Sequence, residues 1–127
     1  MRFTYPNSDK LKSKKTIDLL FTKGKSVSKY PLRLVYMPLD PEIEPSSKIG
    51  VSVSKKYFKH AVDRNYFKRL LRETYRLNQS ILRQDDKPYA LMFFYQTKDR
   101  LDFETINALT IKLFEKFLAQ ITAASDT

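Results

Sequence analysis

The sequence predicts one α/β domain, an α+β sandwich in which helices cover a small mixed sheet. Apolar residues alternate in some segments and recur at helical spacing in others, which is typical of strands and helices combined in one fold. The chain has 127 residues, enough for one hydrophobic core and short for two. We therefore expect a single domain over residues 1–127, with frayed ends at about 1–8 and 123–127.

Three segments have the pattern of amphipathic helices. Apolar residues recur at helical spacing within Lys10–Lys23, and Gly24 follows at the position of a C-terminal cap. A central helix is predicted over Ala61–Leu77. Asp102 precedes an apolar stripe within Phe103–Ile121, so this aspartate is predicted to cap a final helix.

Three further segments are predicted strands. Tyr30–Leu39 alternates as a half-exposed strand does, and Ile49–Ser54 alternates apolar residues with glycine and serine. Tyr89–Tyr95 is apolar almost throughout, which indicates a strand buried on both faces. The acidic, proline-containing segment Asp40–Ser47 is predicted to be a solvated loop. The predicted order is therefore helix, strand, strand, helix, strand, helix.

Basic residues are concentrated in two segments of the chain. Met1–Lys29 contains eight basic and two acidic residues, Lys48–Arg76 contains nine and two, and the rest of the chain has a net charge of −3. The total of +10 points to a polyanionic partner, either nucleic acid or an anionic membrane surface. The longest apolar stretch, Tyr89–Tyr95, is too short to span a bilayer, and we expect no membrane partner.

Several residue types that build enzyme active sites are missing. Cysteine is absent, which excludes disulfides, thiol nucleophiles and cysteine-ligated zinc, and which fits the reducing cytoplasm where we expect the protein to act. His60 is the single histidine, and the sequence shows no acidic metal-binding motif and no glycine-rich phosphate loop. We therefore predict no catalytic residue, no metal site and no cofactor bound by the protein itself.

The central helix is predicted to present one cationic face and one apolar face. At about 100° per residue, its basic residues and Asn65 fall within an arc of roughly 140°, and its apolar residues occupy the opposite arc. Like charges on one face repel one another, and a polyphosphate partner reverses that penalty. Three lysines before the helix extend the patch. The predicted nucleic-acid-binding residues are Lys55, Lys56, Lys59, Arg64, Asn65, Lys68, Arg69, Arg72 and Arg76.

The run IGVSVSKKYFKHAVDRNYFKRLLRETY resembles the most distinctive segment of the bacterial ribonuclease P protein family. In that family a strand ends in a Ser-Lys-Lys step and leads to a helix that carries Arg-Asn-Arg, then Lys-Arg and Arg-Glu. Tyr66 stands where the family usually has the second Arg of this signature. Weaker similarity extends over Leu11–Phe117 and includes the N-terminal LKSKKTIDLLFTKGKSV. The matching residues are Ser54, Lys55, Lys56, Ala61, Val62, Arg64, Asn65, Lys68, Arg69, Arg72 and Glu73.

The resemblance implies a sandwich with a left-handed βαβ crossover and a protein subunit of an RNA-based endoribonuclease. Such a subunit binds the catalytic RNA and precursor tRNA and promotes removal of the tRNA 5′ leader. Cleavage and its Mg²⁺ ions are then expected in the RNA, and no obligate protein partner is expected. The signature helix is expected to contact the large RNA. A cleft between the first helix and the sheet is expected to hold the leader, with Ile17, Phe21, Arg33 and Val35 as candidate contacts.

Three alternatives stay open at this stage. A general or ribosomal RNA-binding protein shares the basic faces, a DNA-binding helix module shares the cationic helix, and a stand-alone ribonuclease acts without an RNA subunit. Basic charge alone does not separate RNA from DNA, or a specific interface from a solvated surface. Helical spacing alone favours a buried core position for Phe21, and only the resemblance makes it a candidate leader contact.

Overall fold

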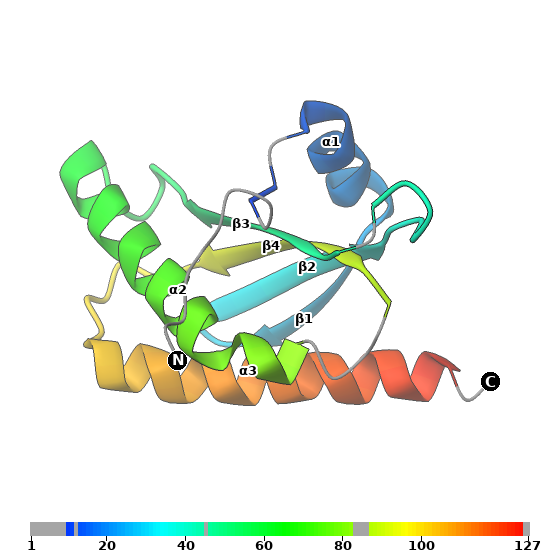
Figure 1. Ribbon diagram of the computed structural model, residues 1–127. Helices are drawn as coiled ribbons and strands as arrows, with labels where there is room; N and C mark the ends of the chain where they lie inside the picture. The colour runs from blue at the N-terminus through cyan, green and yellow to red at the C-terminus, as the bar shows by residue number, and fades with distance from the viewer. Residues whose placement is uncertain (1–9, 12, 45, 83–86, 126–127) are drawn as a thin grey trace.

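The computed structural model describes residues 10–11, 13–44, 46–82 and 87–125, which form a four-stranded sheet with helices on both faces (Figure 1). The predicted fold class is confirmed. The elements in chain order are α1 (Lys14–Lys23), β1 (Lys25–Lys29), β2 (Leu32–Pro38), β3 (Lys48–Val53), α2 (Ala61–Leu82), β4 (Tyr89–Tyr95) and α3 (Phe103–Ser125).

The sheet has the strand order β1-β2-β4-β3. β2 pairs antiparallel with β1 and β4, and β3 pairs parallel with β4. The predicted order lacked β1 and was wrong there, because the five residues KSVSK contain one apolar side chain, Val27, and therefore show no alternation. α2 connects β3 to its parallel neighbour β4, and the left-handedness of this crossover stays a prediction.

Two hydrophobic clusters lie on opposite faces of the sheet. The larger lies between the sheet and the pair α2 and α3, and its fully buried members include Phe67, Phe93 and Phe114. The smaller one lies under α1 and is built from Leu20, Val35, Ala90 and Met92. Burial of a side chain such as Leu20 stabilises the fold by about 1.5–3 kcal/mol. β4 contributes to both clusters, which confirms that it is buried on both faces.

The edges of the sheet are covered by other parts of the chain. On β1, the Ser28 carbonyl accepts a hydrogen bond from the Lys116 ammonium at 2.7 Å, and the Ser26 carbonyl accepts one from the Gln120 amide at 3.4 Å. On β3, the Leu11 backbone N–H donates to the Ile49 carbonyl at 3.0 Å. Backbone groups on both outer strands are therefore already bonded.

The helix boundaries differ from the predicted ones where tertiary contacts intervene. α1 begins after Ser13, whose hydroxyl accepts a hydrogen bond from the Thr16 N–H, because Lys10 pairs with the β3 edge instead of entering the helix. α2 begins at Ala61 as predicted and continues to Leu82, whose side chain is buried. α3 continues to Ser125, within the segment expected to fray, and the expected N-terminal fraying concerns residues outside the described part of the chain.

Gly24 ends α1 as predicted, although its conformation is not left-handed. Its φ of −72° and ψ of 154° are extended, and its N–H donates to the Leu20 carbonyl. A Cβ at this position would lie 2.2 Å from the Leu20 carbonyl oxygen and 3.0 Å from Val35 Cγ1. Glycine is therefore required here by the close approach of two backbone segments.

Gly24→Ala is expected to lower the free energy of unfolding by about 1–3 kcal/mol, because the new methyl group collides with a backbone oxygen. Gly50→Ala is the matched control, since its Cβ would meet the flexible Met92 side chain at 3.0 Å. Urea denaturation of both variants tests this. Equal losses for the two glycines would contradict the assignment.

Asp102 caps α3, as the sequence predicts. Its carboxylate accepts a hydrogen bond from the Thr105 backbone N–H at 2.8 Å. Hydrogen bonds from the Thr105 side chain and then from its backbone N–H lower the pKa of the exposed Asp102 carboxyl below the ordinary value of 3.8. The charged carboxylate is therefore the form that stabilises the folded chain.

Asp102→Asn tests this charge, because asparagine keeps the acceptor and does not titrate. A lowered folded-state pKa gives stabilisation that is complete above 3.8 and is lost as the pH falls through the folded-state value. We expect the wild-type protein to have the higher thermal midpoint at pH 7 and the difference to shrink as the pH falls below 3.8. A difference that is constant across this range would rule out the carboxylate as its source.

Candidate nucleic-acid interface

The turn between β3 and α2 projects three lysines into solvent. Ser54 organises this turn: its hydroxyl accepts a hydrogen bond from the Lys56 N–H at 3.1 Å, and its carbonyl accepts from two further backbone N–H groups. Lys55, Lys56 and Lys59 are all exposed. The predicted lysine extension of the basic patch is therefore present at the start of α2.

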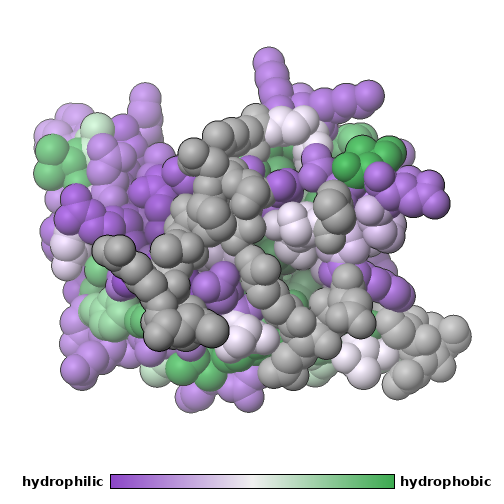
Figure 2. All heavy atoms as spheres, in the orientation of Figure 1, coloured by the Kyte–Doolittle hydropathy of each residue, from purple (hydrophilic) through white to green (hydrophobic). Residues whose placement is uncertain are grey.

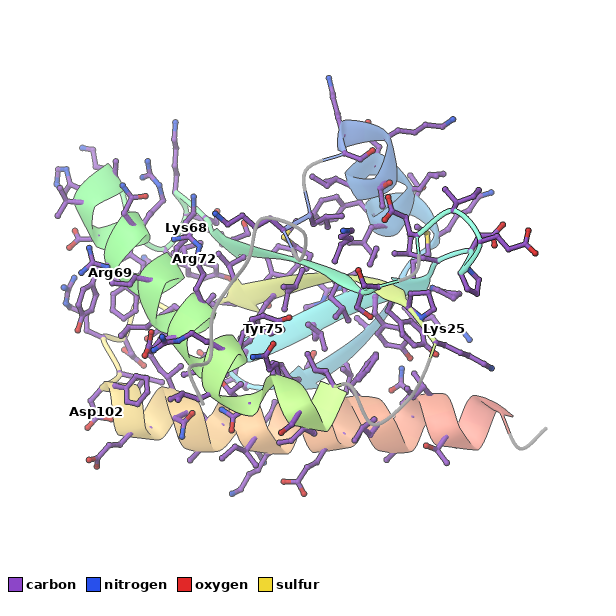
Figure 3. The ribbon with its side chains drawn as sticks, viewed as in Figure 1. Lys25, Lys68, Arg69, Arg72, Tyr75 and Asp102 are labelled. Atoms are coloured by element: carbon purple, nitrogen blue, oxygen red, sulfur yellow. The ribbon has the colours of Figure 1, made fainter. Side chains whose placement is uncertain are left out.

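The two faces of α2 are separated as the helical wheel predicts. Phe67 and Leu71 are fully buried against the sheet and α3, so the opposite face is turned outward. Figure 3 shows Lys68 and Arg72 on the side of α2 toward β3, with Arg69 on the other side of the helix. In Figure 2, hydrophilic side chains cover the region of α2 at the left of the view. The residues that the structure leaves exposed on this face are Asn65, Arg69 and Arg72.

Two of the predicted arginines are already bonded within the protein. Arg64 Nη1 donates to the Phe58 carbonyl at 2.9 Å and to the Lys59 carbonyl at 2.8 Å, which fastens the β3–α2 turn to the helix. Arg76 forms an ion pair with Glu73 one turn away. These arginines contribute to the structure of the helix and its turn as well as to the charge of the patch.

An open cleft of about 580 Å³ connects the basic face of α2 with α1. Ile17 on α1 lines one wall, Gly50 on β3 lines the floor and Arg72 on α2 lines the other wall. A predicted leader contact and a predicted signature residue therefore share one cleft. A Cβ at position 50 would lie 3.0 Å from the Met92 side chain, which stands beside Gly50 on β4 and lines the same cleft. The remaining lining residues are Lys10, Leu11, Ile49, Val51 and Met92.

A second surface lies on the same face of the sheet, beside the last turn of α1. Phe21 is 58% exposed, and its ring centroid lies 6.0 Å from that of half-buried Phe94. The register places Phe94 opposite Arg33 on one side and opposite Ser52 on the other. An exposed aromatic ring, a second ring and an arginine therefore lie together, which suits an unpaired base and its phosphate.

The four candidate leader contacts divide into three environments. Phe21 and Arg33 are exposed, and Ile17 is half-buried on the wall of the cleft. Val35 is only 6% exposed and packs in the core under α1, and its contact with the leader stays a prediction. The alternation of β2 predicts which face Val35 occupies, but not that Leu20 covers it.

Phe94 was not predicted as a site residue, because the continuous apolar run of β4 gives no alternation from which an accessible ring could be recognised. Within the described residues, no group of three or more His, Asp or Glu side chains is placed to hold a metal ion. None of the helices in the described ranges combines the length and apolar character that a bilayer crossing requires.

Comparison with known proteins identifies the relatives of this chain. Residues 5–118 match the family described as Ribonuclease P. The ribonuclease P protein component of Porphyromonas gingivalis is 40% identical over 108 residues, which cover 82% of this chain and 79% of the relative. The corresponding protein of Dictyoglomus thermophilum is 32% identical over 114 residues, covering 90% and 92%.

Solved structures share the fold. The RNase P protein of Staphylococcus aureus superposes with a TM-score of 0.69 at 21% identity, over 84% of this chain and 93% of that one. The RNase P protein of Thermotoga maritima, solved in complex with 1-(4-fluorophenyl)-2-thiourea, gives a TM-score of 0.67 at 25% identity, over 84% and 97%.

The two kinds of arginine on α2 are expected to respond differently to truncation. Arg69→Ala removes an exposed cation and is expected to weaken binding of a large structured RNA, with the salt slope reduced in magnitude by about 1. Arg64→Ala also removes the bonds to two carbonyls, so it is expected to lower the thermal midpoint as well. Binding titrations over a KCl series, with exposed Lys112→Ala on α3 as the control, test this. An unchanged slope for both arginine variants would place the RNA elsewhere.

Proposed function

The chain belongs to the ribonuclease P protein family, whose members are components of an RNA-based endoribonuclease, and on that premise we propose how it acts. The protein binds the catalytic RNA through the basic face of α2 and holds the 5′ leader of precursor tRNA beside α1. Promotion of 5′ maturation of tRNA follows from these two contacts. The observation that carries the proposal is the cleft that both Arg72 of α2 and Ile17 of α1 line.

The basic face of α2 and the turn before it supply the contacts to the large RNA. Lys55, Lys56 and Lys59 of the turn and Arg69 and Arg72 of the helix are exposed, and Lys68 is partly exposed. The core holds this helix through Phe67 and Leu71. Arginine forks can bridge phosphate oxygens, and Asn65 can both donate to and accept from a base or ribose edge. Binding relieves the mutual repulsion of these cations, since each phosphate neutralises the positive charge of the side chain that it contacts.

The surface beside α1 supplies the contact to the leader. Phe21 presents an exposed ring on which an unpaired base can stack. Arg33 lies opposite Phe94, where it can neutralise phosphates of the single-stranded leader. Mature tRNA has no leader and so gains nothing from this surface. The protein therefore favours precursor over product.

The cleavage chemistry is assigned to the RNA subunit in this proposal. The protein lowers the repulsion between two polyanions and positions the leader, and Mg²⁺ is expected to be bound in the RNA active site. A higher Mg²⁺ concentration can partly replace this screening, so the contribution of the protein is largest when Mg²⁺ is scarce.

Cleavage of precursor tRNA at low Mg²⁺ tests the proposal, with the protein alone, a bacterial ribonuclease P RNA alone, and both together. We expect cleavage to require the RNA and to increase when protein is added. Cleavage by protein freed of all RNA would show an enzyme in its own right. No effect of the protein would favour a different RNA-binding role.

Phe21→Ala is expected to weaken binding of precursor tRNA by the assembled ribonucleoprotein by about 1–3 kcal/mol, the range found for a stacked base. Binding of mature tRNA should not change. Leu19→Ala is the matched control, because Leu19 is a partly exposed apolar residue on the same helix. Equal losses for precursor and mature tRNA would show that Phe21 does not act through the leader.

A further inference from the structure

Arg100 lies in the loop between β4 and α3, far in sequence from the signature helix, yet it is seated on the first turns of α2. Its Nη1 atom lies 3.0 Å from the Asp63 carboxylate. Its guanidinium carbon lies 5.9 Å from the centre of the Tyr66 ring and 5.3 Å from that of Phe67. A third ring, that of Phe58 in the turn before α2, has its centre 5.9 Å from the guanidinium carbon. One ion pair and three cation–π contacts therefore fix this side chain on the turn and first turns of α2.

The loop that carries Arg100 is itself fastened on both sides of the arginine. The Tyr95 hydroxyl donates to the Asp99 carbonyl and accepts from the Leu101 N–H, which lies 3.1 Å away. Burial raises the pKa of Tyr95 above 10.0, which keeps this hydroxyl protonated as a donor. The Tyr95 ring stacks on Phe67 with centroids 4.7 Å apart. The loop is thus bonded to the Tyr95 hydroxyl, and α2 packs on the Tyr95 ring through Phe67.

Arg100 lies beside Tyr66, where the apolar arc of α2 borders the basic face. Asn65, Tyr66 and Arg69 are exposed neighbours on the helix, and the guanidinium of Arg100 lies beside Tyr66. Tyr66 is also the position at which this chain departs from the Arg-Asn-Arg signature. Arg100, from a loop distant in sequence, therefore lies next to Tyr66, the position at which α2 lacks the second arginine of the signature.

We propose that Arg100 is an RNA-binding residue that supplies, from the β4–α3 loop, the positive charge that Tyr66 does not provide. The inference rests on the proposed function, because it adds a contact to the same RNA interface. A guanidinium carries five N–H donors, and the ion pair with Asp63 uses one at Nη1. The other donors of the fork can bond a phosphate, while the aromatic rings hold the side chain in place and Asp63 competes with the phosphate for the guanidinium.

A purely structural role is the competing explanation, in which Arg100 only ties the loop to α2. The two roles differ in their salt dependence. A structural arginine changes stability and leaves the number of released counterions unaltered, whereas a phosphate contact contributes about 1 to the salt slope. The slope is therefore the readout that separates them.

The experiment measures the affinity of the full chain for a bacterial ribonuclease P RNA over a KCl series. The variants are Arg100→Gln, the double variant Arg100→Gln with Tyr66→Arg, and the control Lys112→Gln, which removes the same charge from an exposed site on α3. We expect Arg100→Gln to reduce the magnitude of the slope by about 1 and the double variant to restore it. Lys112→Gln should leave the slope unchanged.

A second variant leaves Arg100 in place and tests the proposal independently of whether Arg100→Gln folds. Asp63→Asn removes the carboxylate that competes for Arg100, so RNA binding is expected to tighten several-fold. Glu115→Gln, which removes an exposed carboxylate from α3, should tighten binding much less.

Three results would overturn the inference. These are an unchanged slope for folded Arg100→Gln, an equal loss for Lys112→Gln, and equal tightening by Asp63→Asn and Glu115→Gln. A wild-type chain that fails to bind this RNA at all would instead refute the proposed function, so the two failures are distinguishable.

Discussion

The burial of β4 on both faces is the constraint on which the rest of the structure depends. A strand with apolar side chains on both sides requires a cover on each, and α1 supplies one while α2 and α3 supply the other (Figure 1). β4 is also the strand at which antiparallel and parallel pairing meet, between β2 and β3. The position of α2 at the β3 side of the sheet, and of α1 above it, follows from these two demands. The cleft that both helices line is therefore a product of how the core is closed.

Rigidity and charge are combined in α2 by the same packing. Phe67 and Leu71 bury one face of the helix in the core, so the opposite, cationic face must point outward. The repulsion among its basic residues is tolerated because burial of the apolar face, and the polar contacts to α3, outweigh it. The Asn78 side-chain amide donates a hydrogen bond to the side-chain oxygen of Asn107 at 2.7 Å. The Thr110 hydroxyl donates one to the Thr74 hydroxyl at 3.2 Å. Because packing already fixes this helix, the proposed binding of RNA would require little further ordering of the protein.

Much of the fold could be predicted from periodicity, and the exceptions have physical causes. β4 was predicted with its observed bounds, and α2 with its observed start, because apolar spacing is strong in both segments. β1 was missed because one apolar residue, Val27, cannot show a period. The composition of the basic face was predictable, whereas the bonds that occupy Arg64 depend on a turn that helical spacing does not describe. Phe94 and Arg100 enter the site through strand register and a long-range loop contact, which a local pattern does not contain.

The covered edges of the sheet also affect whether copies of the chain associate with one another. Unpaired strand edges invite other chains to add to the sheet, and a helix side chain or a chain terminus bonded to them blocks that addition. Lys116 and Gln120 serve this purpose on β1, and Leu11 does so at Ile49 on β3. These bonded carbonyls on the two outer strands thus oppose the addition of a further strand from another copy of the chain.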